Sequence, residues 1–392
     1  DMVLLGGGLP NAQAFPFVSF EAKITGGEEV KVTEGNGLRL ALQYNGAGVK
    51  SLTAWCRDFM EEYVKPASKG WDVVPTAGSS DAIEKLCGLL LNPGDVVLTE
   101  DHTYSAALSN IRGVGAKACG VAADELGIIP EKLEEKCQAL AEKKASFVGI
   151  YLIPVGANPS GAVMSEERIK QIYDIAAKYD LWIMEDCAYD WLRYNHDVKS
   201  TDVPGLRFGG FQSIDTQGRA MRIDTVSKFL APGLRTGWFT APKDLVVHMT
   251  KASALSTQTG SAVSQSLVVG LLDKWGRKGL KAHVEKIQKV YQERRNIVAR
   301  AFEREMKGLC EWRVPTAGMF FWFKPVASIK SVEVVQLLLK NKVLLAPGEF
   351  FKANEDNHPS QWLRLSFSFA KNEDLEAGVA LISKVLRKLK SN

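Results

Sequence analysis

The chain has little cysteine and no long apolar segment, and both features restrict its class. The six cysteines include no Cys-x-x-Cys pair and no regular spacing, which fits a reducing compartment rather than a disulfide framework. No run reaches the roughly 18 apolar residues that a membrane span needs. We therefore expect a cytoplasmic protein with no membrane segment.

The sequence also lacks any segment in which charges of one sign are concentrated. The 49 Lys and Arg residues and 45 Asp and Glu residues leave a formal net charge of +4, spread over the whole length. Neither a nucleic-acid surface nor a polybasic membrane anchor is indicated, so small molecules are the expected partners. An apolar share of 46% excludes a disordered chain, and 392 residues are normal for two domains.

The two ends contain little targeting information. The chain starts at Asp1 without an initiator Met, and the apolar stretch 2–5 is too short for a signal peptide. We expect that some N-terminal sequence is missing. The last residues, 389–392, contain no peroxisomal or retention signal.

Strand-like and helical patterns alternate from about residue 71 to residue 242, which predicts an α/β domain with a mostly parallel sheet. Apolar residues at i, i+3, i+4 and i+7 from Ile83 and from Ile169 predict two amphipathic helices. Ser165, followed by two glutamates, is typical of the second helix's N-cap. The expected strands are residues 96–99, 147–155, 181–185, 221–226 and 238–240.

A second, smaller α/β unit is expected after the first. Around residues 276–283 the pattern changes to a long charged helix that would lead out of the large domain. Strand-like runs at 312–324 and 343–369, with helices between and after them, make up the small domain, and the segment before Leu42 is expected to join it. The predicted ranges are 42–283 for the large domain, and 1–41 with 284–392 for the small one.

The segment with the clearest chemistry surrounds Lys228, which follows a predicted strand and comes just after the hydroxyl residues Thr225 and Ser227. An amine must be partly deprotonated to form an imine, and burial beside a cation such as Arg235 lowers its pKa. Thr225, Ser227 and Arg235 also supply donors for a phosphate. For the Ser-Lys pair alone, a solvated surface lysine is the ordinary alternative.

Three further strand ends bear polar or aromatic side chains, where ligands bind in open α/β sheets. Asn158, in a Pro/Gly-rich turn, can donate a hydrogen bond to a ring hydroxyl or a substrate carboxylate. Asp186 could pair with a protonated pyridine nitrogen, and Tyr189 could then bond the ring phenolate. Tyr104 could stack on an aromatic ring. For the first two positions, the alternative is an ordinary loop, turn or cap residue.

Two more segments could bind anions. Ser79 and Ser80 lie in Thr-Ala-Gly-Ser-Ser-Asp, where a helix begins, and free N–H groups at such a point form an anion site. A plain serine N-cap is the alternative there. Arg364 is a single arginine in an apolar strand, where a bidentate bond to a substrate carboxylate would satisfy it. An edge-strand arginine that faces water is the other interpretation.

In this order, these segments resemble the fold-type I pyridoxal-phosphate (PLP) aminotransferases, most closely the kynurenine/α-aminoadipate and aromatic aminotransferase group. The resemblance runs nearly from end to end. It implies the aspartate aminotransferase-like α/β fold, a large domain with a mostly parallel seven-stranded sheet plus a smaller α/β domain. Further landmarks are residues 6–11, 42–44, 92–95, 317–320 and 345–348.

The resemblance implies a role for each residue around the cofactor ring. Lys228 would form the Schiff base with PLP and move the proton between the substrate Cα and the cofactor C4′. Asp186 would pair with the pyridine nitrogen, while Asn158 and Tyr189 bond the ring oxygen. Tyr104 would stack on the ring.

The resemblance also implies phosphate, substrate and subunit contacts. Tyr44 would reach the phosphate from a second subunit, which makes the active unit a homodimer with shared sites. Arg364 and Asn158 would hold the substrate carboxylate, and the strip 7–9, with Gly8 at its centre, would line the side-chain pocket. The implied phosphate ligands within one chain are Ser79, Ser80, Thr225, Ser227 and Arg235.

Three features depart from the family pattern. Ser80 stands where close relatives usually have glutamine, so the phosphate would rely there on backbone groups. A gating segment ahead of the Gly-Gly-Leu-Pro strip is not present in the sequence, which puts the substrate preference in doubt. The turn at 155–157 differs from the commoner Asn/Gly-rich version, although Asn158 itself is kept.

The implied activity is a ping-pong transamination. An L-amino acid of aromatic, kynurenine or 2-aminoadipate type would donate its amino group to a 2-oxo acid such as 2-oxoglutarate. Within the same cofactor class, a β-lyase, a decarboxylase or a carbon–carbon bond-forming enzyme is the alternative. From another functional class, the alternative is a PLP-sensing transcription regulator, which reuses this fold to bind a ligand. Such a regulator would need a basic helix-turn-helix domain ahead of Gly6. A scaffold protein with a decayed site would not need these polar residue types at strand ends.

Overall fold

The computed structural model describes residues 8–33, 37–354 and 358–391. Its centre is a seven-stranded sheet with strand order β3-β11-β10-β9-β8-β4-β5. Within this sheet β11 alone runs antiparallel to its neighbours, so the predicted mostly parallel α/β sheet is confirmed. The strands are β3 (Trp71–Thr76), β4 (Val96–Glu100), β5 (Lys117–Val121), β8 (Phe147–Leu152), β9 (Trp182–Asp186), β10 (Ala220–Thr225) and β11 (Gly237–Pro242).

Each expected strand of the large domain overlaps an observed one, with two informative differences. The strand expected at 147–155 ends at Leu152, since Pro154 has no N–H for a ladder. The strand expected at 221–226 ends one residue earlier, and Val226–Lys228 forms a short 3-10 turn, η5. Lys228 is therefore held by a turn rather than by the end of the strand.

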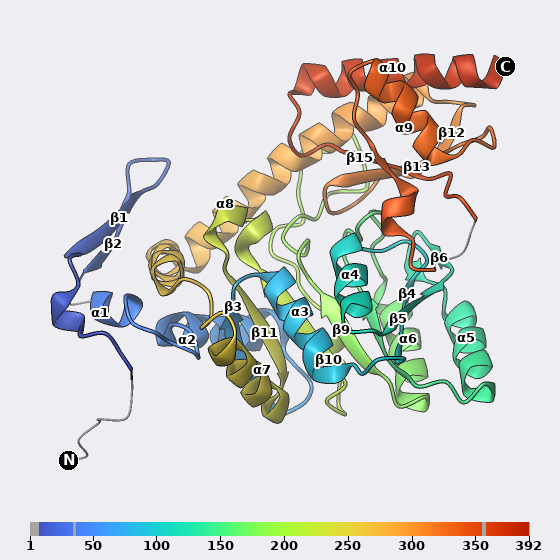
Figure 1. The fold of residues 1–392 in the computed structure, drawn as a ribbon. Coiled ribbons are helices and arrows are strands. Elements are labelled where there is room, and N and C mark those ends of the chain that lie inside the picture. The colour runs from blue at the N-terminus through green and yellow to red at the C-terminus, as the bar shows by residue number, and fades with distance from the viewer. Residues whose placement is uncertain (1–7, 34–36, 355–357, 392) are drawn as a thin grey trace.

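Helices cover both faces of the sheet (Figure 1). Alternate strand residues pack into opposite clusters: Tyr151 and Met184 face one cluster, while Ile150 and Ile183 face the other. Ser165 is the N-cap of α6, as predicted, because its hydroxyl accepts a hydrogen bond from the Arg168 N–H at 3.1 Å. The helices are α2 (Lys50–Phe59), α3 (Ser79–Leu90), α4 (Ser105–Gly113), α5 (Pro130–Glu142), α6 (Glu166–Lys178) and α7 (Lys243–Leu255).

A long helix, α8 (Ala262–Glu305), leads from the large domain to a four-stranded antiparallel sheet of order β12-β13-β15-β14. Gly276 has φ 53° and ψ −167°, so the helix is kinked where the charged pattern was expected to begin. Among the described residues, no helix is long and apolar enough to cross a membrane. The remaining elements of this unit are β12 (Cys310–Trp312), β13 (Phe320–Pro325), β14 (Ala346–Pro347), β15 (Leu363–Ser366), α9 (Ser331–Lys340) and α10 (Asn372–Ser391).

The N-terminal segment lies elsewhere than expected. Its hairpin of β1 (Ser19–Lys23) and β2 (Glu29–Thr33), with the short α1 (Leu38–Ala41), packs on the first part of α8. Val32 and Leu38 contact this part of α8 because its apolar Leu267 faces them, and Figure 1 shows the hairpin far from α9 and α10. The expectation that this segment joins the small domain is therefore not met by its contacts, and the domain ranges stay a prediction.

Two glycine turns join the large domain to the small one. Gly156 has φ 63° and Gly318 has φ 77°, backbone conformations that favour glycine. A Cβ at Gly156 would lie 2.7 Å from the Gly318 nitrogen, and one at Gly318 would lie 2.8 Å from the Gly156 oxygen. Asn158 comes two residues after Gly156, and Phe320 comes two residues after Gly318. The close contact of the two glycines therefore brings Asn158 of the large domain near Phe320 of the small one.

Replacement Gly156→Ala is expected to lower the free energy of unfolding by about 1–3 kcal/mol, through positive φ and the backbone clash. Gly88→Ala is the matched control, because a Cβ there meets nothing within 4 Å in the exposed face of α3. The control is expected to stabilise the helix slightly. Denaturant unfolding measures both variants, and equal stabilities would contradict the proposed importance of the glycine contact.

Candidate active site

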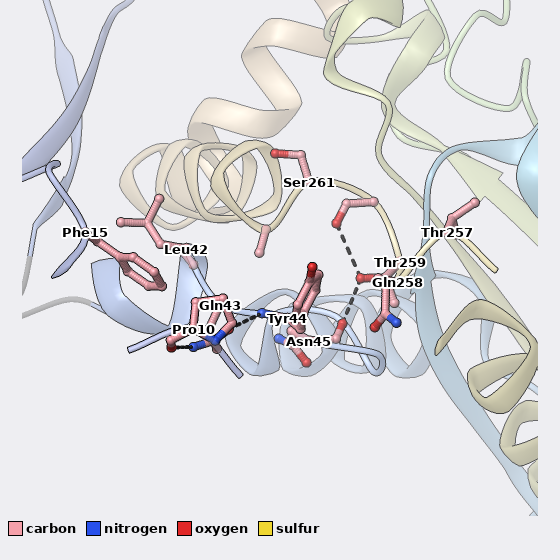
Figure 2. A pocket seen from close by; sticks show the side chains of 13 residues that line it. Pro10, Phe15, Leu42, Gln43, Tyr44, Asn45, Thr257, Gln258, Thr259 and Ser261 are labelled. Atoms are coloured by element: carbon pink, nitrogen blue, oxygen red, sulfur yellow. Dashed lines mark hydrogen bonds between the residues drawn. The ribbon is translucent and has the colours of Figure 1, made fainter. Parts of the chain in front are cut away.

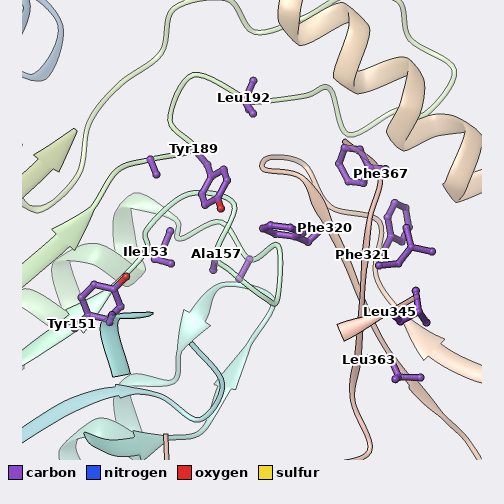
Figure 3. Close-up of a cluster of buried hydrophobic side chains, with 14 of the residues drawn as sticks. Tyr151, Ile153, Ala157, Tyr189, Leu192, Phe320, Phe321, Leu345, Leu363 and Phe367 are labelled. Atoms are coloured by element: carbon purple, nitrogen blue, oxygen red, sulfur yellow. The ribbon is translucent and has the colours of Figure 1, made fainter. Parts of the chain in front are cut away.

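The carboxyl ends of β8, β9 and β10 lie side by side, and the predicted polar residues gather there. Asn158 follows β8, Asp186 ends β9, and Lys228 follows β10. The Lys228 Nζ atom lies 5.7 Å from the centre of the Tyr189 ring. Figure 3 shows Tyr189 beside Phe320 of the small domain, and their ring centres are 5.9 Å apart. The site therefore lies where the two domains meet.

Lys228 is in the environment that an amine nucleophile needs. Burial lowers the pKa of its amine, and the guanidinium groups of Arg235 and Arg364 lower it further, whereas the Asp186 carboxylate raises it. The predicted combination of burial and a neighbouring cation is thus present. The net downward shift increases the fraction of neutral amine at neutral pH.

Asp186 is a buried carboxylate with one oxygen unused. Its Oδ2 accepts a hydrogen bond from the Tyr151 hydroxyl at 3.0 Å, but its Oδ1 has no hydrogen-bond partner among the described residues. Burial raises the pKa of this carboxyl to about 6, against the Tyr151 hydrogen bond, which lowers it. Such an oxygen is expensive to leave unpaired, so it fits a bound cationic donor.

Arg364 and Asn158 form the second polar centre. Arg364 donates from Nη1 to the Asn158 Oδ1 atom at 2.7 Å, which joins β15 to the turn after β8. The guanidinium lies between the rings of Phe320 and Phe351, 4.2 and 4.7 Å from their centres. Its buried Nε has no partner in the described chain. Burial lowers the pKa of Arg364, and a bound carboxylate would supply the missing acceptor.

A third group of residues forms a corner suited to phosphate. The Arg235 side chain donates from Nη2 to the Ala77 carbonyl at 2.7 Å, so it lies across the start of α3. Gly78 has φ 94°, a backbone conformation that favours glycine, and a Cβ there would be 2.7 Å from that Nη2 atom and would displace the arginine. The Thr225 and Ser227 hydroxyls are 2.8 Å apart on the neighbouring turn. N–H groups at the start of a helix favour a bound anion, so this corner would suit the predicted phosphate.

Ser79 lies at a helix start, as predicted, and Tyr104 follows β4 at the carboxyl end of the strand, where it was expected. Ser79 is the first residue of α3 and Tyr104 immediately precedes α4. Ser80 is exposed, which agrees with a backbone role at that position. Tyr104 packs against the buried cluster that contains Tyr151 and Tyr189. Burial raises the pKa of Tyr189, and nearby Asp186 raises it further.

The site residues fit PLP on three observations: the Asp186 Oδ1 and the Arg364 Nε have no partner among the described residues, and Gly78, with φ 94°, lets Arg235 lie close to the start of α3. When bound, PLP supplies an electron sink for the carbanion that forms at the substrate Cα. Asp186 would hold its pyridine nitrogen and the start of α3 its phosphate.

Two predicted contacts are not formed within one chain. Tyr44 is 61% exposed and lines a hollow of about 450 Å³ with the loop 257–262 (Figure 2). Gly8 is exposed, and a Cβ there would meet nothing within 4 Å. Gly7 lies outside the described residues. Both contacts therefore stay predictions.

Sequence reasoning missed several residues that the fold brings to the site. Tyr151 lies in the middle of an apolar strand and Phe351 in a short 3-10 turn, so neither stood out. Arg222 forms a buried ion pair with Asp190 at 2.7 Å and with Asp224 at 2.8 Å. Arg222, like Arg364, is a charged residue inside an apolar strand, and this pattern alone could have indicated from the sequence that it has a buried partner.

The fold and this site define a PLP-dependent aminotransferase. The aminotransferase class I and II family matches residues 30–382, and the chain belongs to that family. The mitochondrial kynurenine/α-aminoadipate aminotransferase of Bos taurus is 31% identical, over 99% of this chain and 92% of the relative. An aromatic-amino-acid aminotransferase of Thermococcus litoralis is also 31% identical, over 99% and 88%.

Solved structures show the same relationship. Aminotransferase Aro8 of Candida albicans has a TM-score of 0.90 at 30% identity and covers 99% of this chain and 92% of its own. Pyrococcus horikoshii kynurenine aminotransferase, solved with PMP, has a TM-score of 0.81 at 28% identity and covers 89% and 83%. These similarities agree with the predicted fold type and cofactor.

The replacement Arg364→Lys is expected to raise KM for the amino acid and to lower kcat/KM by about tenfold to a hundredfold, since an ammonium group cannot form the bidentate bond. Steady-state kinetics measure the effect. Arg313→Lys, at an exposed arginine paired with Glu125, is the control. A KM for Arg364→Lys equal to that of the control would show that Arg364 does not bind the substrate carboxylate.

Proposed function

We propose that this enzyme transfers the amino group of an L-amino acid of aromatic, kynurenine or 2-aminoadipate type to a 2-oxo acid such as 2-oxoglutarate. The convergence of Lys228 with the Arg364–Asn158 pair is the observation that supports this most directly. One group moves a proton while the other holds the carboxylate that every amino acid and 2-oxo acid has. The printed names of the relatives support the donor types.

Each proposed role follows from a contact. Arg364 would bind the carboxylate through its free Nε, and Asn158 would keep the guanidinium in place. The neutral Nζ of Lys228 would remove the Cα proton as a general base and then, as a general acid, would return a proton at the position of the cofactor C4′, two bonds away. Tyr189 and Phe320 would exclude water from this proton transfer.

The aromatic and kynurenine donors are supported by the aromatic surroundings of Arg364. Phe320 and Phe351 enclose the guanidinium, and Tyr189 packs edge-on against Phe320. Such rings favour an aromatic donor side chain. The β-lyase, decarboxylase and bond-forming alternatives are not favoured, since the similar proteins are named as aminotransferases.

Titration of the PLP-loaded enzyme with a panel of L-amino acids is expected to convert the visible absorption of the cofactor with aromatic amino acids, kynurenine or 2-aminoadipate. Lys228→Ala should lose at least about a hundredfold in kcat, because the proton-transfer group is removed. Lys178→Ala, an exposed lysine paired with Glu134, should match the wild type. Conversion by none of these donors would overturn the proposed substrate class.

We further propose a homodimer in which Tyr44 of each subunit completes the phosphate corner of the other. The support is its exposure and the apolar side chains exposed in the same N-terminal segment, Leu9, Phe17, Val18 and Leu40. A second copy of the chain would cover them. Residues implied to bind one cofactor would then come from two chains.

Mixing Lys228→Ala with Tyr44→Ala tests this arrangement. If sites are shared, each hybrid dimer has one intact site, and about a quarter of wild-type activity should return after subunit exchange. If Tyr44 serves its own chain, every site remains defective and no activity returns. Light scattering checks that both variants have the same oligomeric state.

We propose a reducing compartment, with the cytoplasm as first choice. The six cysteines are free and five of them are buried. A mitochondrial site, as in the printed names of the mammalian relatives, would suit free thiols equally. Fractionation of cells that express the natural gene distinguishes the two compartments.

A further inference from the structure

Tyr151 is a fully buried tyrosine whose hydroxyl reaches the site from the neighbouring strand. It lies in β8 opposite Met184 of β9, and Asp186 is two residues farther along β9 on the same face. Diagonal neighbours of this kind are within reach of aromatic side chains. The length of the tyrosine ring therefore lets its hydroxyl donate to the Asp186 Oδ2 atom at 3.0 Å.

This hydrogen bond is the strongest interaction that favours the ionised form of Asp186. Burial raises the pKa of that carboxyl, and the Tyr151 hydroxyl opposes the shift more than the nearby Ala188 N–H or the charge of Lys228 does. Asp224 of β10 acts in the other direction. A carboxylate must be ionised to hold a proton on a pyridine nitrogen, so the donor bears on the chemistry of the site.

The hydrogen bond from Tyr151 also determines which oxygen of Asp186 remains available to a ligand. Oδ2 is occupied by Tyr151, whereas Oδ1 is buried and has no partner in the described part of the chain. A carboxylate with both oxygens free could turn about its last torsion, which is broad. The hydrogen bond to Oδ2 opposes that rotation. It therefore keeps Oδ1 in one orientation, in which it can accept a bond from a ligand.

We propose that Tyr151 is a positioning residue for Asp186: by donating to Oδ2, it keeps the carboxylate ionised and leaves Oδ1 for the pyridine nitrogen of the cofactor. This inference rests on the proposed role of Asp186. Titratable or charged groups beside this pair come from four elements: Lys228 of η5, Asp224 of β10, Tyr104 before α4 and Tyr189 after β9.

Tyr151→Phe in the PLP-loaded enzyme tests the proposal, since it removes the hydroxyl and keeps the ring. Tyr173→Phe is the matched control, because Tyr173 is a buried tyrosine that donates to Asp215 at 2.9 Å in the other cluster. Both variants lose a buried tyrosine–aspartate hydrogen bond, but only Tyr151 contacts the site. Effects common to both therefore measure the structural loss.

The expected result is a change in kcat and in the pH titration of the cofactor absorption. For Tyr151→Phe, kcat should fall by about tenfold, the equivalent of one pKa unit, with little change in KM. The titration midpoint should rise by about half a unit, because a ring with less positive charge releases the proton beside Lys228 less readily. Values equal to those of Tyr173→Phe would overturn the proposal.

Stability without cofactor gives a readout that is independent of activity. The folded pKa of Asp186 is raised to about 6, so stability falls as pH rises from about 4, the value in unfolded chains, to the folded pKa. Loss of the Tyr151 donor raises the folded pKa further. Tyr151→Phe should therefore lose more stability at pH 8 than at pH 4, and a loss equal at both pH values would contradict this.

Asp186→Asn separates this proposal from the proposed role of Asp186. If that variant leaves kcat and the titration midpoint unchanged, the role of Asp186 itself fails. If it changes both while Tyr151→Phe changes neither, only the role of Tyr151 fails. Should Tyr151→Phe not fold, a fluorinated tyrosine at position 151, a stronger donor of the same shape, is expected to lower the midpoint; an unchanged midpoint would overturn the proposal.

Discussion

The geometry of the site depends on the buried ion pairs that the Arg222 guanidinium forms with Asp190 and Asp224. The guanidinium is fully buried, and it donates to Asp224, to Asp190 and to the Gly209 carbonyl at 2.7–2.8 Å. Removing Arg222 would leave the buried Asp224 carboxylate without its bidentate partner, which costs about 3–5 kcal/mol. Since Asp190 follows β9 and Asp224 lies near the end of β10, this network holds together the strand ends that bear Asp186 and Lys228.

The network also explains why two acids at neighbouring strand ends differ in role. Both oxygens of Asp224 accept hydrogen bonds from Arg222, so its charge is compensated within the protein. Asp186 has the Tyr151 hydroxyl on one oxygen and no described partner on the other. A buried acid with an unused acceptor is the one that can hold a cationic ligand, and sequence position alone does not distinguish the two.

The sequence was sufficient to predict features that depend on local pattern. Alternation of apolar runs predicted the parallel sheet, and the residues at strand ends, among them Asn158, Asp186 and Lys228, do converge, because parallel strands end at one edge. Strand register is not local. The pairing of Tyr151 with Met184 therefore had to come from the structure, and with it the hydrogen bond to Asp186. The sandwich of Arg364 between Phe320 and Phe351 likewise joins segments distant in sequence.

The N-terminal segment shows a second limit of such prediction. From the sequence alone, the segment before Leu42 was expected to join the small domain. Val32 and Leu38 instead contact α8, while Leu9 and Tyr44 remain more than half exposed. Exposed apolar side chains that gather in one segment are typical of a binding surface. Patterns within one sequence can therefore identify such residues as apolar, but they do not identify the surface on which a segment packs.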